Sequence, residues 1–431
     1  MFYIVETRQQ LRNLHCSGDE CYVNIIPLND NYHSSLSSPS LIYFRTPQGK
    51  GYIFPIDHSE GFSLELDEVL EWISKYSTIY TLNKKECLYY FPTSKLVDVS
   101  YGTLPNCSSL FRDWCYSVFP ARHYTNSLIP ISKHFEEQEK IFDEVKDKFE
   151  RPSNQFYNET FPQVFKAIEK KGIQINKELF DKHFKYQHEE YFIKDSRVYT
   201  KYNLYNLTTR PTNSFNGVNF AALNKNDGSR AAFIPRNDYF FEFDYDAYHV
   251  RILAKLIDYQ LDNESVHTQL GRMYFQKETL TDAEYQQSKE LTFKQLYGGV
   301  FKQYVDIPFF KAMQTYVNSL WKTFNETQEL ELIGGKILKA EEITNPTPNK
   351  ILNYIIQSAE TYNNVVSVKK VIEYLADKQS DVILYTYDSF LIDYAVSDGK
   401  ETLKQIKQLL EHDGYVIKVE YGLDYDSLNK I

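Results

Sequence analysis

The stretch FEFDYDAYHVRILAKL, residues 241–256, runs a hydrophobic strand directly into Asp244 and then continues with helical spacing. Alternation in YFFEFDYDAY predicts a strand that enters a core, and the helix after it collects apolar residues on one face: Val250, Leu253, Ala254 and Ile257. A carboxylate at the end of a buried strand is costly to desolvate unless a positive charge lies against it. Asp244 is therefore expected either to cap the helix or to face a cleft.

A second segment, SKELTFKQLYGG (288–299), supplies groups that suit a nucleotide. Lys289, Phe293 and Tyr297 follow one another at intervals of four and form one stripe on a helix. The stripe offers a cation for phosphates and aromatic faces for a sugar and a base. An ordinary amphipathic helix with two core aromatics has the same spacing.

A third segment, DVILYTYDSFLIDYA (381–395), predicts a hairpin with Asp388 at its tip. If Asp388 meets Asp244 across a sheet, the two carboxylates repel each other and favour divalent cations between them. Two Mg²⁺ ions roughly 4 Å apart are the usual means of in-line phosphoryl transfer. A turn aspartate without a function is the alternative.

The composition limits the classes of function. A net charge of −10 excludes a uniformly basic nucleic-acid coat but not a local basic cleft. Neither GxGxxG nor GxxxxGK[ST] occurs among so few glycines, 16 in all, so no Rossmann or P-loop site is expected. The five cysteines form no CxxC pair, which fits a reducing compartment. The start does not resemble a signal peptide and no apolar run could span a membrane, so a cytoplasmic protein is expected.

The first half of the chain alternates between strand and helix patterns. A hairpin is predicted at 43–56, a helix at 64–76 and a strand at 96–101, which together indicate an α/β module. A charged helix at 133–150 is expected to end before Pro152. Residues 155–184 predict a helix, a glycine turn and a second helix, and the polar stretch from about 193 suits contact with sugar and phosphate.

The order of these segments resembles the palm and fingers of family A DNA polymerases, the group of bacterial DNA polymerase I and its phage relatives. DYDAYHVRILA is similar to the family's DYSQIELRILA palm motif, KELTFKQLYG to its fingers helix, and YTYDSFLIDY to its HDE motif. Other segments in the family's order are NETFPQVFKAIEKKGIQIN (before the thumb), VYTKYNLYNLTTRPTN (TGRLSS segment), DGSRAAFIP (strand before the palm motif), VHTQLGRMYF (DIHT helix) and NYIIQSAETYNNVV (NxPIQGTAAD helix). The resemblance spans about 158–425 and suggests a compact, phage-type enzyme in a bacterial cytoplasm.

This resemblance implies template-directed addition of dNTPs to a primer 3′-hydroxyl by two-metal-ion nucleotidyl transfer. Asp244, Asp388 and the backbone carbonyl of Tyr245 would hold two Mg²⁺ ions, with Mn²⁺ as a substitute. Lys289 would contact the triphosphate and protonate the leaving group. The other implied contacts are His267 (phosphate), Phe293 (deoxyribose), Tyr297 (nascent base pair), and Arg210, Arg230, Asn353 and Gln357 (primer–template DNA).

The nucleotide site departs from the family pattern at two positions. Tyr285 stands where an arginine usually precedes the fingers lysine, and Arg272 on the preceding helix is the candidate substitute. His249 stands where a glutamate usually blocks the 2′-hydroxyl, and its imidazole is expected to fill space and to hydrogen-bond Tyr297.

The palm also departs from the pattern, since Tyr387 and Ser389 flank the hairpin aspartate in place of histidine and glutamate. Arg251 matches the motif's arginine and is expected to support the palm. These changes predict a working polymerase that is slower or differently selective.

The implied fold is α/β: a right-hand polymerase with an antiparallel-sheet palm, helical fingers and a reduced thumb, preceded by an exonuclease-like (RNase H-like) domain. The expected domains are 1–130 (degenerate exonuclease-like), 131–210 (helical connector and reduced thumb) and 211–431 (palm and fingers, with fingers at about 260–325). So short a thumb predicts weak grip and low processivity unless a partner protein supplies the clamp. The strand YVNIIPL lacks the Asp-x-Glu pair of a proofreading site, Asp98 is a candidate remnant, and no proofreading is expected.

Two other functions stay open. A single-subunit RNA polymerase would share Lys289, Tyr297 and a serine after Asp388, but Phe293 is typical of the DNA enzymes and no promoter-binding domain is visible. A catalytically inactive DNA-binding scaffold would explain the missing arginine, glutamate and thumb. A scaffold would not need the retained aspartates, lysine and tyrosine.

Overall fold

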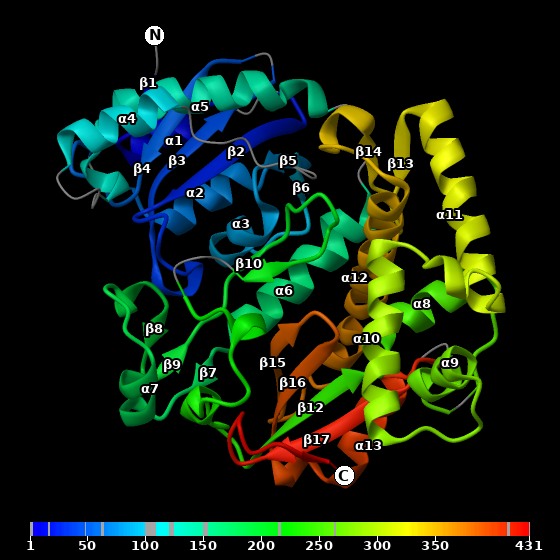
Figure 1. The fold of residues 1–431 in the computed structure, drawn as a ribbon. Helices are drawn as coiled ribbons and strands as arrows, with labels where there is room; N and C mark the ends of the chain where they lie inside the picture. Colours follow the sequence, from blue (N-terminus) through cyan, green and yellow to red (C-terminus); the bar gives the residue numbers. More distant parts are fainter. Residues whose placement is uncertain are drawn as a thin grey trace. The chain divides into compact units, whose positions relative to one another are not determined.

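The chain forms two units in the computed structural model, which describes residues 3–15, 18–47, 49–61, 64–99, 109–119, 125–149, 154–213, 217–262, 264–411 and 414–430 (Figure 1). The first unit comprises Met1–Tyr205 and Asn213–Ala222, and the second comprises Asn206–Thr212 and Leu223–Ile431. None of the described helices has the length and apolar character needed to cross a lipid bilayer.

A six-stranded mixed sheet of order β1-β4-β3-β2-β5-β6 organises the first unit. Strands β2, β3 and β4 pair antiparallel, whereas β2 with β5, β5 with β6 and β1 with β4 pair parallel. The strands are β1 (Tyr3–Ile4), β2 (Glu20–Pro27), β3 (Pro39–Arg45), β4 (Gly51–Pro55), β5 (Thr78–Thr81) and β6 (Leu96–Asp98). The hairpin predicted at 43–56 is β3–β4. The strand predicted at 96–101 is found as β6 over residues 96–98, and residues 100 and 101 of that prediction lie outside the described chain.

Helices cover both faces of this sheet because β3 alternates its side chains between two cores. Ile42 and Phe44 pack with Trp72 of α2 on one face, while Leu41 and Tyr43 share the other face with α5. The helices in this part of the chain are α1 (Arg8–Asn13), α2 (Leu66–Ile73), α3 (Lys84–Tyr90), α4 (Ser109–Val118) and α5 (Ile131–Val145). Since α5 belongs to this core, the domain boundary predicted at residue 130 falls inside a packed layer. Pro152, expected to end the charged helix, lies outside the described residues.

The rest of the first unit is short elements. They are a π-helical turn (Phe156–Thr160), α6 (Phe161–Glu169), β7 (Ile173–Gln174), α7 (Lys177–His183), β8 (Ile193–Lys194), β9 (Arg197–Val198) and β10 (Tyr202–Asn203). Gly172, at φ +63°, makes the predicted glycine turn between α6 and β7. Strand β11 (Thr212–Asn213) falls where the chain passes from one unit to the other.

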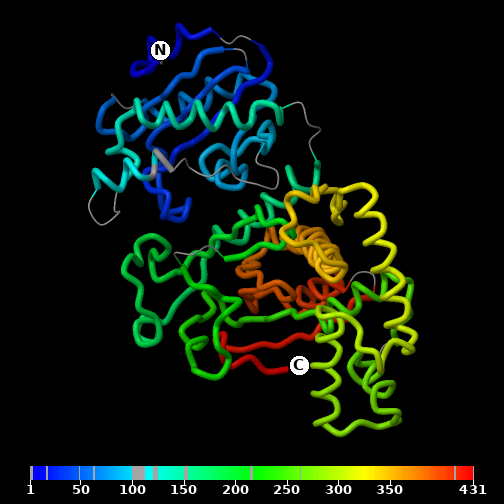
Figure 2. The backbone as a smooth tube through the Cα atoms, turned by 45° about the horizontal axis from the view of Figure 1, so that its top comes forward, coloured from blue at the N-terminus to red at the C-terminus, as the bar shows by residue number. Residues whose placement is uncertain are grey.

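The second unit is built on an antiparallel sheet of order β15-β16-β12-β17-β18. Its strands are β12 (Tyr239–Tyr245), β15 (Asp381–Thr386), β16 (Ser389–Tyr394), β17 (Ile417–Gly422) and β18 (Asn429–Lys430), with a separate β13 (Glu329–Glu331) and β14 (Ile337–Lys339) hairpin. Its helices are α8 (Tyr248–Leu256), α9 (Val266–Phe275), α10 (Asp282–Gly298), α11 (Pro308–Thr327), α12 (Pro348–Tyr374) and α13 (Lys400–Leu410). Figure 2 follows the chain from the sheet through α9–α11 and back along α12.

Candidate active site

Asp244 lies at the end of the central strand β12, as the opening stretch predicts. The helix α8 begins after Ala247, which adopts a left-handed conformation and forms no side-chain cap. Asp244 therefore does not cap this helix. It is paired across the sheet with Ser389 on one side and Lys418 on the other.

The predicted hairpin brings Asp388 to the same place. Strands β15 and β16 form it, and Asp388 occupies the turn after Tyr387, at φ +63°. The backbone nitrogen of Tyr245 donates to the carbonyl of Asp388 at 3.0 Å. The hairpin tip is thus fastened to the end of β12, beside Asp244.

The two carboxyl groups lie in an environment that disfavours negative charge. Burial raises the pKa of Asp244 to about 7, with added repulsion from Asp388 and from Glu242. Burial and Glu360 also raise the pKa of Asp388. Among the described residues, neither Asp244 nor Asp388 forms an ion pair with a basic side chain. A site of this kind gains from a bound cation.

The α10 stripe faces this pair, as predicted. Lys289, Phe293 and Tyr297 line the same pocket, and the rings of Phe293 and Tyr297 are parallel within 3°. The opposite face of α10 is fixed to α9, since Ser288 donates to the carbonyl of His267 at 2.6 Å and Thr292 bonds Tyr274. Anchoring the back of the helix leaves the stripe available to a ligand.

One pocket of about 220 Å³ collects these groups. All of its lining residues belong to the second unit: Arg210, Asp244, Tyr245, Asp246, Ala247, Tyr248, His249, His267, Tyr285, Lys289, Phe293, Tyr297, Glu360, Asp388 and Lys418. Residues that are up to 208 positions apart in the sequence, Arg210 and Lys418, share it. It combines carboxylates, cations and aromatic faces in one small volume.

His249 bonds Tyr297, as its sequence position predicts. The ring nitrogen Nδ1 of His249 forms a hydrogen bond with the Tyr297 hydroxyl. Its Nε2 lies 3.0 Å from the Glu360 carboxylate. Glu360 also pairs with Arg210, whose guanidinium lies over the Tyr387 ring at 3.8 Å.

A second cluster of polar side chains surrounds Lys418 and Asp246, which form an ion pair. Arg251 donates from Nε to the carbonyl of Asp246 at 3.0 Å, which fits the supporting role predicted for this arginine. His267 is 3% exposed, and burial lowers its pKa to about 4. Its imidazole is therefore neutral at pH 7 and would meet a phosphate as a hydrogen-bond donor rather than as a cation.

Four predicted residues do not line this pocket. Arg272 is held by Glu264 through two contacts of 2.8 and 2.9 Å, which disfavours it as the missing arginine. Arg230 is 6% exposed and lies over the Tyr425 ring at 3.6 Å, and the DNA contact expected for it stays a prediction. The remaining two, Asn353 and Gln357, are half-buried on α12, two turns and one turn before Glu360 respectively.

Sequence reasoning missed three charged lining residues: Asp246, Glu360 and Lys418. Asp246 stands in the opening stretch itself. Glu360 falls where the NxPIQGTAAD motif has its first alanine of the pair, so a charged residue at an alanine position was the available signal. Lys418 lies in an ordinary alternating strand, and only its register opposite Asp244 reveals it.

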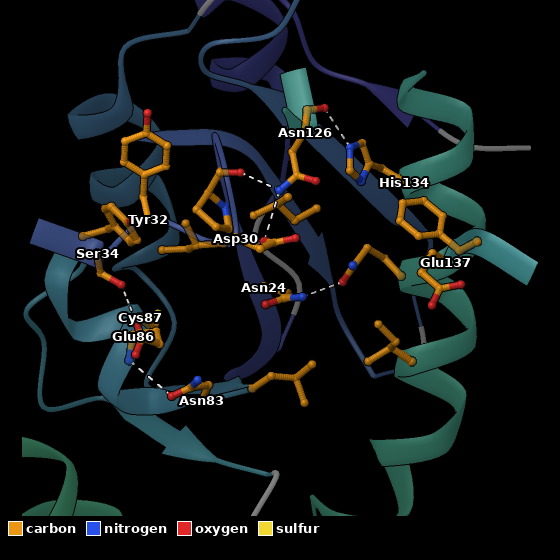
Figure 3. A pocket seen from close by; sticks show the side chains of 18 of the residues that line it. Asn24, Asp30, Tyr32, Ser34, Asn83, Glu86, Cys87, Asn126, His134 and Glu137 are labelled. Carbon is orange, nitrogen blue, oxygen red and sulfur yellow. Dashed lines mark hydrogen bonds between the residues drawn. The ribbon is translucent and has the colours of Figure 1, made fainter. Parts of the chain in front are cut away.

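The first unit has a polar pocket of its own, of about 300 Å³ (Figure 3). Asn24 of β2 lines it and donates to Gln138 at 2.7 Å. Glu86 lines it too, beside Lys85 and Lys201. Asp98, the candidate remnant of a proofreading site, instead accepts from the Lys84 backbone at 2.8 Å and the Tyr205 hydroxyl at 2.6 Å.

No group of three or more His, Cys, Asp or Glu side chains in the described ranges could hold a metal ion alone. Two carboxylates still fit Mg²⁺, because this ion commonly binds through one or two carboxylates and completes its shell with water and substrate phosphates. The donors at Asp244 and Asp388 are hard oxygens, as Mg²⁺ requires.

Comparison with known proteins identifies the fold. No family model and no curated protein matches the sequence. A solved structure does match: the POL domain of Pol1 from M. smegmatis, in complex with DNA primer-template and dNTP, with a TM-score of 0.70 over 95% of this chain and 96% of that chain. The chain has the fold of that polymerase domain. Identity is 12%, so the match shows the fold, and because it covers 95% of the chain it includes the first unit.

Proposed function

We propose that the chain is a template-directed DNA polymerase of the family A type, adding dNTPs to a primer 3′-hydroxyl. The observation that carries this proposal is the pair of aspartates, half-buried Asp244 and exposed Asp388, which line one pocket with the Lys289–Phe293–Tyr297 stripe. Among the described residues, neither aspartate forms an ion pair with a basic side chain. The fold shared with a polymerase domain supports it independently. In this proposal the five-stranded sheet is the palm and α9–α11 are the fingers.

Asp244, Asp388 and the carbonyl of Tyr245 would hold two Mg²⁺ ions, which when bound activate the 3′-hydroxyl and neutralise charge on the triphosphate. Lys289 would bind the triphosphate and stand ready to give a proton to the departing pyrophosphate. Phe293 would support the sugar and Tyr297 the nascent base pair. His267, as a neutral imidazole, would donate a hydrogen bond to a phosphate oxygen.

Lys418 is the better candidate for the cation that the absent arginine would supply. It lines the pocket, whereas Arg272 does not. Its ammonium keeps its charge, because the pKa of Lys418 is raised by Asp246 despite the opposing effect of burial. Lys418 and Lys289 would then approach the triphosphate from the sheet and from α10.

DNA contacts would come from Asn353 and Gln357 on α12 and, within the pocket, from Arg210. The segment between β7 and β10 builds no helix longer than the seven residues of α7 in its described part. So short a thumb supports weak grip on the duplex, and a partner protein would be needed for processive synthesis. In the first unit, Asn24 donates to Gln138, and Asp98 accepts hydrogen bonds from the Lys84 backbone and the Tyr205 hydroxyl. These contacts support a first unit that does not proofread.

Primer extension tests the proposal. Wild-type protein with Mg²⁺, a primer–template and dNTPs should extend the primer according to the template, and rNTPs should be used poorly. Efficient extension with rNTPs alone would favour an RNA polymerase. No extension by wild type under any divalent ion would favour the scaffold.

A further inference from the structure

The second unit has another pocket, of about 390 Å³, between α13 and the five-stranded sheet. Its apolar wall consists of Phe241 and Phe243 of β12, Ile417 and Val419 of β17, and Leu403 of α13. Side chains alternate between the two faces of a strand, so those of Phe243 and Val419, which are paired across the sheet, lie on the face opposite to Asp244. This pocket therefore lies behind the sheet as seen from the nucleotide pocket.

The polar part of this pocket is positively charged throughout. Four lysines line it, and no aspartate or glutamate does, although the chain as a whole has a net charge of −10. The lysines are Lys404 and Lys407 of α13, Lys418 of β17 and Lys430 of β18. We call the pocket the basic groove.

The existing partners of these lysines hold them weakly or elsewhere. Lys404 and Lys407 pair with Glu401 and Glu411 of their own helix, and such pairs at the surface contribute only about 0.2–1 kcal/mol. Lys418 also lines the nucleotide pocket, where its ammonium pairs with Asp246. The lysines of α13 are thus available to an anionic ligand that binds in the groove.

One strand edge beside the basic groove has no partner strand in the described ranges. Strand β17 pairs with β12 along its whole length, whereas β18 pairs only with residues 420 and 421 of β17. The backbone nitrogen of Asp246 donates to the carbonyl of Val416, and bonded pairs alternate along an antiparallel ladder. The backbone groups of Ile417 and Val419 therefore point away from β12, toward the open edge. Such an edge is a template for an added strand.

We propose that the basic groove binds an acidic, extended segment of a partner protein, which pairs with residues 417–419 as an added strand and places an apolar side chain in the pocket. The open edge would supply main-chain hydrogen bonds, the apolar wall a site for one side chain, and the lysines the complementary charge. Nucleic acid fits less well, because five of the nine lining residues are apolar and a phosphate backbone offers no donors to a strand edge. The proposal does not depend on the proposed function, since a segment bound behind the sheet leaves the nucleotide pocket open.

Fluorescence anisotropy tests the proposal with the full chain and a fluorescein-labelled peptide that alternates glutamate with valine on both sides of one central phenylalanine. Wild type should bind this peptide with a Kd on the order of 10 μM. A peptide with lysine in place of every glutamate should show no binding, because the groove would repel it.

Two variants separate the charge from the strand edge. Lys404→Glu combined with Lys407→Glu should weaken peptide binding at least about tenfold by reversing two charges. Lys400→Glu is the matched control, because Lys400 is exposed on α13 but does not line the groove, and it should change the Kd by less than about twofold. Val419→Pro removes a main-chain donor that points away from β12, so it should weaken binding at least about tenfold without breaking the ladder to β12. The α13 variants keep the test available if Val419→Pro does not fold.

Three outcomes overturn the proposal. The first is no binding of the acidic peptide by folded wild type at about 1 mM, or equal binding by wild type and both groove variants. The second is displacement of the peptide by a single-stranded oligonucleotide of equal charge at a similar concentration, which would make the groove a general site for polyanions. The third is a wild-type dimer in sedimentation that Val419→Pro abolishes, which would assign the edge to a second copy of this chain. Primer extension is measured separately, so its absence would refute the polymerase function and leave the groove standing.

Discussion

Each unit of this chain has a polar pocket lined by carboxylates, and one carboxyl group in each, Glu86 in the first and Asp244 in the second, has a pKa shifted in the opposite direction from the other. In the first unit, Lys201 and Lys85 lower the pKa of Glu86, although burial acts against them. In the second unit, burial and Asp388 raise the pKa of Asp244 to about 7. Glu86 already has cationic partners inside the protein, whereas Asp244 is the carboxyl group that a bound cation would stabilise in the proposed function.

The same contrast extends to the amides. In the first pocket an amide, Asn24 of β2, donates to Gln138 (Figure 3). In the second pocket the hairpin and the central strand bring two aspartates together. Glu86, which has cationic partners, and the aspartates 244 and 388, which form no ion pair among the described residues, make the comparison open to experiment.

The largest effect is expected from removing a carboxylate of the second pocket. Asp388→Ala and Asp244→Ala should each lower primer extension about 1,000-fold or more, because each removes a metal ligand that acts in the transition state. The matched control is Glu86→Gln in the first pocket, which should leave extension within a factor of three. Equal loss in all three variants would mean that the contrast between pockets has no functional meaning.

The next effect concerns the cations that face the aspartates. Lys289→Ala and Lys418→Ala should each raise KM for dNTP about 10- to 100-fold, since a charge-assisted contact to phosphate contributes about 1.5–3 kcal/mol. Arg272→Ala should change KM little, because Arg272 pairs with Glu264 outside the pocket. Steady-state kinetics at saturating primer–template measure this. A large effect at Arg272 with none at Lys418 would reverse the assignment.

Stability should change in opposite directions in the two pockets. Glu86→Gln should lower the free energy of unfolding by about 2 kcal/mol, because it leaves lysines with weaker partners. Asp244→Asn should raise it at pH 8, on the order of 1–2 kcal/mol after allowance for partial solvation. A carboxyl group whose pKa is raised on folding costs stability above pH 4, increasingly up to pH 7. Urea unfolding at pH 8 and pH 4 should therefore show the Asp244→Asn gain only at pH 8. A gain of equal size at both values would contradict the shifted pKa.

The smallest effect is expected from metal alone. Mg²⁺ should raise the Tm of wild type by a few degrees at pH 8, and by less at pH 6, where protons compete for Asp244. At a concentration ten times its Kd the ion would contribute about 1.4 kcal/mol. Thermal unfolding of Asp388→Asn should show no such shift, whereas Glu86→Gln should show the wild-type response. Identical shifts in both variants would place the ion elsewhere.

The parts of this site that could be predicted from sequence are those that local patterns encode. The change from alternating to helical spacing predicts the junction at Asp244, the interval of four predicts the α10 stripe, and two strands around a turn predict the hairpin at Asp388. Each is visible within about sixteen residues of the chain.

The parts that could not be predicted depend on how distant elements meet. Lys418 reaches the site only through the register of β17 against β12. Glu360 lines the pocket because α12 passes beside His249 of α8. From the sequence, Arg272 was a candidate to bind the triphosphate, because no local pattern shows its ion pair with Glu264 in the preceding loop. The boundary expected at residue 130 stays a prediction, and the packing of α5 on the first sheet through its apolar face is a contact that local patterns did not reveal.

The most direct test is the position of the metal ions. Crystals of the protein with primer–template and a non-reacting dNTP analogue, grown with Mn²⁺, would give anomalous peaks at the metal sites. The account predicts two manganese ions in the second unit, with carboxylate oxygens of Asp244 and Asp388 both within about 2.0–2.3 Å of a shared ion. Manganese that binds elsewhere, or carboxyl groups that share no ion, would contradict it.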